Sequence, residues 1–217
     1  MTRSDRRTIL LAFCLSALAG YVDSLGFLTL KGFFVSFMSG NSTRLAVGIA
    51  SGAWPTAQTA AGLIGLFVLG VVGGGIGSHL ARERRPPVLC VVALLLGLAA
   101  LAASAGHDGW SIGLATLALG AENIVLSRAG EVSIGVTYMT GTLVKMGHGI
   151  AKALTGGPRW EWLPYLLLWA ALAAGSILGA LLFPTLRLQG LWIAAGWCTV
   201  LVPVSAITQR PRTGPGR

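Results

Sequence analysis

Charged side chains are scarce in this sequence, and so are the residue types that form disulfides or bind metals. Asp, Glu, Lys and Arg make up 11% of its 217 residues, well below the roughly 25% found in soluble domains. Cys14, Cys90 and Cys198 lie inside separate apolar runs, so we predict packing residues and no disulfide framework. The three histidines show no metal-binding spacing. These scarcities argue against a soluble catalytic or nucleic-acid-binding domain.

Motifs for catalysis and cofactor binding are also missing. The sequence contains no nucleophile elbow, phosphate-binding glycine loop, zinc motif or nucleic-acid module. We therefore expect no enzymatic activity, no cofactor, no metal and no nucleic-acid partner. An intramembrane enzyme ranks last among the functions considered, because no nucleophile is paired with a base.

The sequence is rich in apolar residues and glycine. Apolar residues make up 54% of the chain, 31 residues are glycine, and the mean hydropathy is +0.75. This composition predicts an all-α, multi-pass membrane protein with one membrane domain over 1–217. Six segments are long enough to span a bilayer, at about 8–30, 57–81, 88–106, 109–127, 162–184 and 189–208.

The N-terminus resembles a signal peptide. Arg3, Arg6 and Arg7 precede an apolar stretch, and the sequence at 17–19 (ALA) looks like a cleavage site. We expect the segment to be retained, because the polar stretch at 20–23 that follows has a counterpart in the second half of the chain.

Two shorter segments, about 36–51 and 137–155, carry a motif that occurs twice. The sequence FMSGNSTR at 37–44 returns as YMTGTLVK at 138–145, which is 101 positions later (138 against 37). Each copy contains a Met-Ser/Thr-Gly break in an apolar segment. Internal duplication with polar breaks is the best sequence indication of a transport site in a membrane protein.

Basic residues distinguish two topologies, in which the short segments either cross the bilayer or enter and leave by one face. If neither crosses, only Lys31 and Arg187 lie on one side. The other side then holds twelve basic residues, at 3, 6, 7, 82, 84, 85, 128, 152, 159, 210, 212 and 217. If both cross, the division is eight against six. The positive-inside rule favours the first topology, with both termini in the cytoplasm.

The six spans form two halves of three, about 8–106 and 109–208. An odd number of spans turns the second half upside down relative to the first. The predicted fold is therefore a polytopic bundle of two inverted three-span repeats with two re-entrant half-helices. We expect 209–217 to be a disordered cytoplasmic tail.

Two glycine pairs also recur between the halves. Gly73 and Gly77 in the second span correspond to Gly175 and Gly179 in the fifth. This spacing lets helix backbones approach closely, so we predict that the pairs pack against each other or across a homodimer. The alternative is chance, since glycine-rich membrane helices show this spacing often.

In this topology each half-helix begins near the bilayer midplane, at its Ser/Thr-Gly break. Ser39 or Asn41 is expected to cap the first half-helix, and Thr140, Gly141 and Thr142 occupy the mirrored positions. Free N–H groups and the partial positive charge of helix N-termini favour an anion, or the negative end of a zwitterion.

Arg44 and Lys145 lie about one turn beyond the two breaks. They either contribute charge to a solute site or extend to opposite membrane surfaces. Gly40 and Gly141 have a similar alternative, in which they only allow close packing.

Asp23 and Glu122 are the acidic residues placed well inside predicted spans. A buried carboxylate in a membrane is costly and therefore a functional candidate. Their candidate roles are proton carrier, cation ligand, or partner for Arg44 or Lys145. The alternative is a structural ion pair or hydrogen bond between helices. Asn123 aligns with Asp23 in the repeat.

The residues around the breaks resemble a known family. Gly20-x-x-Asp23-x-x-Gly26-Phe27 and Phe34-Val35-Ser36-x-Met38-Ser39-Gly40-Asn41 resemble the opening signature of the YoaK-like bacterial membrane proteins. Gly120-Ala121-Glu122-Asn123 and Thr140-Gly141 are similar to that family's Gly-x-Gln-Asn and Thr-Gly. Glu122 departs from the glutamine, so a proton role for it does not carry over to the family. The resemblance implies about six spans in a bacterial plasma membrane, and it implies no substrate.

We expect a transporter or channel for a small solute that is anionic or zwitterionic, with membrane lipid as the other partner. The alternative is a non-transporting scaffold or accessory subunit. The predicted solute-binding residues are Asp23, Ser39, Gly40, Asn41, Arg44, Glu122, Asn123, Thr140, Gly141, Thr142 and Lys145.

Overall fold

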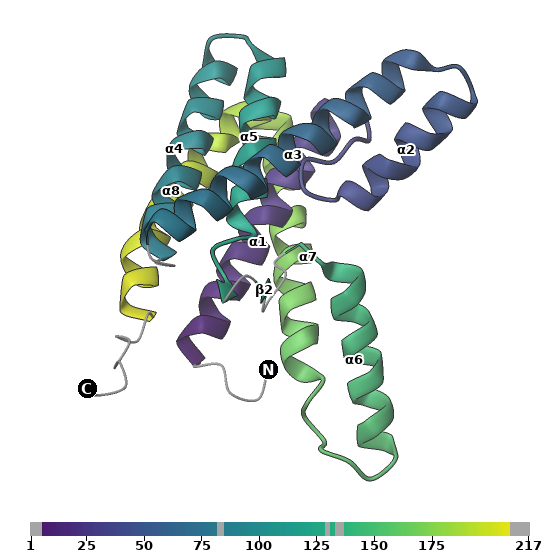
Figure 1. The fold of residues 1–217 in the computed structure, drawn as a ribbon, viewed down its shortest axis with the longest axis vertical. Helices are drawn as coiled ribbons and strands as arrows, with labels where there is room; N and C mark the ends of the chain where they lie inside the picture. The colour runs from purple at the N-terminus through teal and green to yellow at the C-terminus, as the bar shows by residue number, and fades with distance from the viewer. Residues whose placement is uncertain (1–5, 82–84, 129–130, 133–136, 209–217) are drawn as a thin grey trace.

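Helices make up nearly all of the computed structural model, which describes residues 6–81, 85–128, 131–132 and 137–208 (Figure 1). The elements are α1 (Arg6–Thr29), α2 (Met38–Ala50), α3 (Trp54–Leu80), α4 (Arg85–Ser104), α5 (Asp108–Glu122), β1 (Ser127–Arg128), β2 (Glu131–Val132), α6 (Met139–Leu154), α7 (Leu163–Leu186), the 3-10 helix η1 (Arg187–Gly190) and α8 (Leu191–Thr208). The strands β1 and β2 form one short antiparallel pair. The prediction of an all-α helical membrane protein is confirmed at this level. The predicted tail at 209–217 lies outside the described residues.

Four stretches of the described chain are long and apolar enough to cross a membrane. They are Thr8–Thr29, Trp54–Leu80, Arg85–Ser104 and Leu163–Ile207, the last of which covers α7, η1 and α8. The segment predicted at 109–127 differs, because α5 has 15 residues and ends at Glu122. Asn123 follows it and donates a hydrogen bond to the Leu119 carbonyl (2.9 Å). A polar side chain thus satisfies a carbonyl at the end of the helix.

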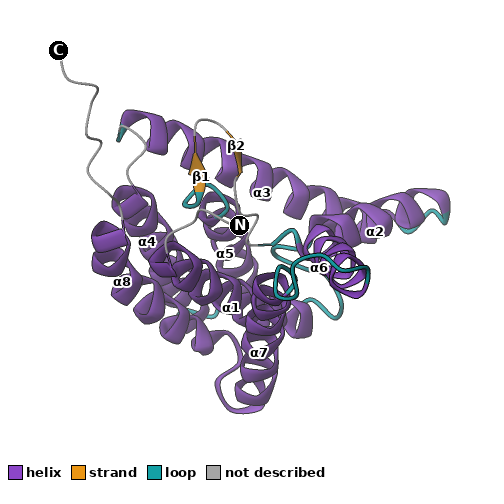
Figure 2. Ribbon diagram, turned by 90° about the horizontal axis from the view of Figure 1, so that it is seen from below, coloured by secondary structure: helices purple, strands orange, loops and turns teal. Residues whose placement is uncertain are grey.

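The core lies where α1, α4, α5 and α8 meet, and it is built from leucine, alanine and valine side chains. In Figure 2, α4 and α8 lie on one side of α1, and α2 and α6 lie on the other. Extensive helix–helix contacts join the two halves of the chain: α1 packs along α7, α3 along α5, and α4 along both α8 and α5.

Glycine makes the contact between α1 and α7 very close. A Cβ atom at Gly175 would overlap the Ala17 carbonyl, and one at Gly179 would lie 2.6 Å from the Tyr21 carbonyl. From the other side, a Cβ atom at Gly20 would overlap the Leu172 carbonyl. Gly175 and Gly179 therefore pack backbone to backbone, but against α1 rather than against α3.

The contact between α3 and α5 is built in the same way, although not from the predicted glycines. Gly70 faces Leu117 and Gly74 faces Ala121, each at backbone distance. A Cβ atom at Gly73 or Gly77 would meet nothing within 4 Å. The prediction that these two glycines pack within the chain is wrong, because a shift of one residue turns a position by about 100° around the helix. Their packing across a homodimer stays a prediction.

The two short helices leave the centre of the molecule in different directions: in Figure 1 the α2–α3 hairpin points to the upper right, and the α6–α7 hairpin points down. Helix α2 runs out and returns as α3, and α6 runs out and returns as α7. Each short helix is thus one arm of a hairpin whose tip projects from the bundle.

Candidate functional site

The first short helix is held in place by Asp23. After α1 the chain reverses at Lys31 and Gly32, which have φ values of 53° and 111°, and runs back beside α1. The backbone N–H groups of Val35 and Ser36 then donate to Asp23 Oδ1 at 2.7 and 2.9 Å. Asp23 therefore fixes the irregular segment that leads into α2, which is the structural alternative considered for this residue.

Asn41 holds the same irregular segment through hydrogen bonds from α2. It is fully buried, its Oδ1 accepts from the Phe34 N–H (3.0 Å), and its Nδ2 donates to the Phe34 carbonyl (2.7 Å). Helix α2 begins after Phe37, with no side-chain cap. The prediction that Ser39 or Asn41 caps this helix is wrong, because the amide of Asn41 is used by Phe34 and Ser39 is exposed.

The second short helix repeats the anchoring. Thr137 Oγ1 donates to Asn123 Oδ1 at 3.0 Å, and both residues are buried. Asn123 corresponds to Asp23 in the repeat, and Thr137 follows Ser36 by the same 101 positions that separate the two break motifs (137 against 36). Helix α6 begins after Tyr138, again with no side-chain cap.

In the first turn of α2 the N–H groups of Met38, Gly40 and Asn41 donate to nearby carbonyls, and that of Ser39 is left free within the described chain. In α6 the N–H groups of Met139 and Thr142 donate in the same way, and those of Thr140 and Gly141 are left free among the described residues.

The side chains at the two breaks are small and accessible. Ser39, Thr140 and Gly141 are exposed, and a Cβ atom at Gly141 would meet nothing within 4 Å. Gly40 differs, since a Cβ atom there would lie 2.8 Å from the Phe37 ring. Thr142 is buried and donates to the Tyr138 carbonyl within its own helix (3.2 Å).

The two basic residues after the breaks lie in different surroundings. The Arg44 guanidinium lies over the Phe33 ring, 4.9 Å from its centroid, at the turn that follows α1. Lys145 is exposed and lines a cavity between α6 and α7. The structure therefore does not bring Arg44 and Lys145 together, and neither forms an ion pair with Asp23 or Glu122 within the described chain.

Glu122 is a fully buried carboxylate at the end of α5. Among the described residues, neither of its oxygens has a hydrogen-bond partner. Its neighbours in sequence are engaged: Ala121 packs against Gly74, and Asn123 holds Thr137. A buried ionised carboxylate without a partner costs several kcal/mol. Glu122 therefore needs a proton, a cation or a donor from a ligand.

Sequence reasoning missed some of these partners. Thr137 and Ser36 could have been found, because they precede the two motifs at equivalent positions. Tyr21 gave no such signal, and its hydroxyl donates to the Gly190 carbonyl in η1 at 3.0 Å. Within the described part of the chain, no three His, Cys, Asp or Glu side chains gather as a metal site would require.

Comparisons with known proteins agree with the membrane architecture. The family model described as "Protein of unknown function (DUF1275)" matches residues 11–204. The chain is also similar to UPF0700 transmembrane protein RA0705 of Rhizobium meliloti (strain 1021), with 32% identity over 202 residues, which cover 93% of this chain and 87% of that protein. No solved structure matches the chain. The predicted YoaK-like resemblance is thus confirmed, and the chain belongs to the DUF1275 (UPF0700) family of multi-pass transmembrane proteins.

Proposed function

We propose that this protein is a transporter or channel for a small anionic or zwitterionic solute in a bacterial plasma membrane. One observation carries the proposal: two short helices begin at equivalent, uncapped breaks, each held by a polar residue of the preceding long helix. Free N–H groups at helix N-termini bind negatively charged groups. Paired broken helices are the usual site of solute binding in transporters built from inverted repeats.

The length of α2 supports a half-helix that does not span the bilayer. It has 13 residues, or about 20 Å, against about 30 Å of hydrocarbon. Length does not separate α6 from α5, which have 16 and 15 residues, and the half-helix assignment of α6 rests on the repeat. Irregular backbone at membrane depth is tolerated only where protein or a wet cavity surrounds it. The contacts of Asp23 and Asn41 with residues 34–36 supply such surroundings before α2.

Contacts at the two ends of the long helices support six spans with both termini on one side. Arg85 Nη1, at the start of α4, donates to Thr8 Oγ1 near the start of α1 (3.3 Å). Ser104, at the end of α4, donates to Gln189 just before α8 (2.9 Å). In the proposed topology the first contact lies at the cytoplasmic face, and the second lies at the opposite face beside Arg187.

The packing between the halves supports an inverted repeat. Helix α1 of the first half lies along α7 of the second, and α5 of the second lies along α3 of the first. The remaining long helices, α4 and α8, lie along each other. An exchange of the two halves maps the first contact onto the second and the third onto itself, as a pseudo-two-fold axis requires.

Within this arrangement, the solute binds at the N-termini of α2 and α6. Ser39, Thr140 and Gly141 offer hydroxyl and backbone donors to its negative group. Glu122 precedes the residue that anchors α6 and is fully buried, and it stays a predicted partner for a positive group or a proton.

The second candidate is a non-transporting scaffold. It is favoured by the internal partners of Asp23 and Asn41, and by Gly73 and Gly77, which face open space suited to a second copy of the chain. In this role the breaks would serve packing alone.

Solute flux separates the two functions. The wild-type protein and two variants, Gly141→Val and Gly147→Val, are reconstituted in liposomes and tested with a panel of anionic and zwitterionic solutes. Both glycines lie on α6 with open space around them, so both variants should fold. We expect uptake by the wild type and by Gly147→Val, and loss of uptake in Gly141→Val. If the panel gives neither flux nor a ligand-dependent thermal shift for the wild type, the scaffold is favoured.

A further inference from the structure

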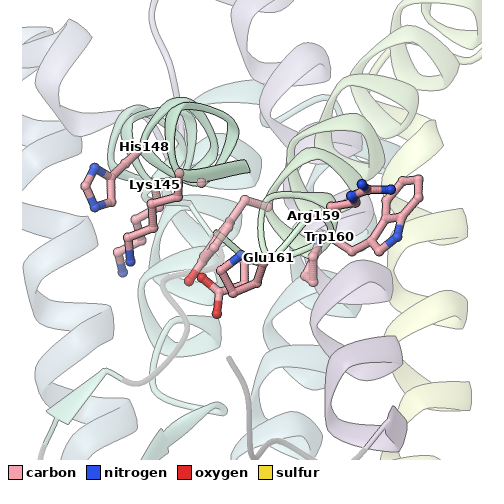
Figure 3. Close-up of a pocket in the computed structure, with 10 residues that line it drawn as sticks. Lys145, His148, Arg159, Trp160 and Glu161 are labelled. Atoms are coloured by element: carbon pink, nitrogen blue, oxygen red, sulfur yellow. The ribbon is translucent and has the colours of Figure 1, made fainter. Parts of the chain in front are cut away.

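A cavity of about 620 Å³ opens between α6 and the start of α7. Its volume is within the range of roughly 300–1,000 Å³ that is typical of ligand sites. In Figure 3, Lys145 and His148 extend from α6 on one side, Glu161 lies opposite them, and Trp160 stands on the far side with Arg159. The lining residues are Lys145, His148, Gly149, Lys152, Pro158, Arg159, Trp160, Glu161, Pro164 and Tyr165.

The α6 wall of this cavity is basic. Lys145, His148 and Lys152 are spaced by three and four residues, so they share one face of the helix. All three are exposed. The cavity lining carries the basic groups of Lys145, Lys152 and Arg159 against the single acidic group of Glu161. Within the described chain, no ion pair joins these lysines to an acid.

The rest of the hairpin suits a membrane surface. Leu143, Ile150 and Leu154 are exposed on α6, and they follow one another at seven and four residues, so they form an apolar stripe on the side of α6 opposite the basic face. In the proposed topology α6 runs from the midplane to the cytoplasmic face, so this stripe faces acyl chains and the long basic side chains extend toward the headgroups. Trp160 and Trp162 lie with ring centroids 6.3 Å apart, and tryptophans gather at the membrane–water interface.

Contacts within the connection between α6 and α7 fix one wall of the cavity. A Cβ atom at Gly149 would lie 3.0 Å from the Trp162 side chain, so the backbone of α6 approaches that residue closely. The Trp162 indole N–H donates to the Arg159 carbonyl at 2.9 Å. The cavity wall opposite α6 is therefore fixed by the protein before any ligand binds.

We propose that this cavity binds the phosphate group of an anionic phospholipid headgroup. Lysine ammonium groups bind phosphate as point charges, and basic pockets between membrane helices on the cytoplasmic side bind anionic headgroups. The site is separate from the breaks at 39–40 and 140–141, and it does not depend on solute transport.

The test compares lipid retention by native mass spectrometry for the full-length protein purified with phosphatidylglycerol and phosphatidylcholine. The wild type should retain phosphatidylglycerol preferentially. Lys145→Gln/Lys152→Gln should lower that preference about fivefold for each lysine, or about 25-fold for the pair. The matched control is Lys31→Gln/Arg187→Gln, which removes the same charge outside the cavity and should keep the preference.

A second measurement, thermal unfolding, controls for misfolding of the variant. It also distinguishes a lipid headgroup from free phosphate as the ligand. Thermal unfolding in phosphatidylcholine should be the same for the wild type and the cavity variant, and Lys145→Arg/Lys152→Arg should restore phosphatidylglycerol binding. An equal loss of preference in the control pair would overturn the proposal. Stabilisation by inorganic phosphate as large as that by phosphatidylglycerol would show a site for free anions and would also overturn it.

Discussion

The α2–α3 and α6–α7 hairpins are the same element of the two halves, but they are packed differently. In the first, a Cβ atom at Gly48 would lie 2.9 Å from the Ala57 backbone nitrogen, and Asn41 and Asp23 close the segment before α2. In the second, the equivalent Gly149 is also tightly packed, since a Cβ atom there would lie 3.0 Å from the Trp162 side chain, but a cavity opens beside this contact, between α6 and the start of α7. The two hairpins thus share the anchored start of each short helix and one close glycine contact, and they differ in the space beside that contact.

The largest expected effect concerns the two anchors. Asp23→Ala leaves the Val35 and Ser36 N–H groups unpaired, which should lower the free energy of unfolding by about 4 kcal/mol. Asn123→Ala removes one hydrogen bond to Thr137 and one to Leu119, which should lower the free energy of unfolding by about 2 kcal/mol. Denaturation in detergent measures both. Asp23→Asn keeps an acceptor oxygen and should recover much of the loss; equal damage from the Asn and Ala variants would remove the hydrogen-bond explanation.

The next effect tests the tight packing of the first hairpin. Gly48→Leu places a side chain against the backbone of α3 and should destabilise the protein by about 3 kcal/mol. Gly147→Leu, on the equivalent short helix, enters open space and should change stability by less than about 0.5 kcal/mol. Thermal unfolding of the two variants compares them directly. Similar melting temperatures would mean that Gly48 is not packed tightly against α3.

Asn41 and Thr142 offer a smaller contrast at equivalent positions. Asn41→Ala removes both bonds to Phe34 and should cost about 2 kcal/mol, because buried donors and acceptors are left unpaired. Among the described residues, the Thr142 hydroxyl bonds only to the Tyr138 carbonyl, just before its own helix, so Thr142→Ala should cost less than about 1 kcal/mol. Hydrogen exchange at residues 34–41 gives the local readout. Unchanged protection there in Asn41→Ala would contradict the role assigned to this amide.

The smallest expected effect is a difference in stability between variants of the two basic residues, Arg44 and Lys145. Arg44→Gln loses the contact with the Phe33 ring and should reduce stability by about 0.5–1 kcal/mol. Lys145→Gln should leave stability in phosphatidylcholine unchanged, because Lys145 is exposed and makes no ion pair within the described chain. The two unfolding curves are measured in the same neutral lipid. A larger loss for Lys145→Gln would reverse the comparison.

The sequence was enough to predict the helix breaks and the polar residues beside them. The repeat at 37–44 and 138–145 gave the position of both short helices, and it aligned Asp23 with Asn123. The repeat has this predictive value because each half contains an irregular segment inside the membrane. The backbone of such a segment needs hydrogen-bond partners from the protein.

The partners of the long helices could not be predicted in the same way. Glycines at 70, 73, 74, 75 and 77 offer several faces of α3 for close packing, and only the arrangement of the other helices selects Gly70 and Gly74. The equivalence of two glycine pairs suggested that α3 meets α7, whereas each of these helices packs on the first helix of the other half. Equivalent positions share a role without being in contact.

The packing of α1 on α7 has a consequence for how the chain assembles. Helix α1 is synthesised first, yet the backbone surface that receives Gly20 belongs to the penultimate long helix. The turn held by Asp23 uses neighbouring residues and can form at once. Docking of α1 waits until most of the protein has left the ribosome. Until then the face of α1 that carries Gly20 is open to lipid or to a membrane chaperone. A fragment that ends before α7 lacks the surface on which its first helix packs.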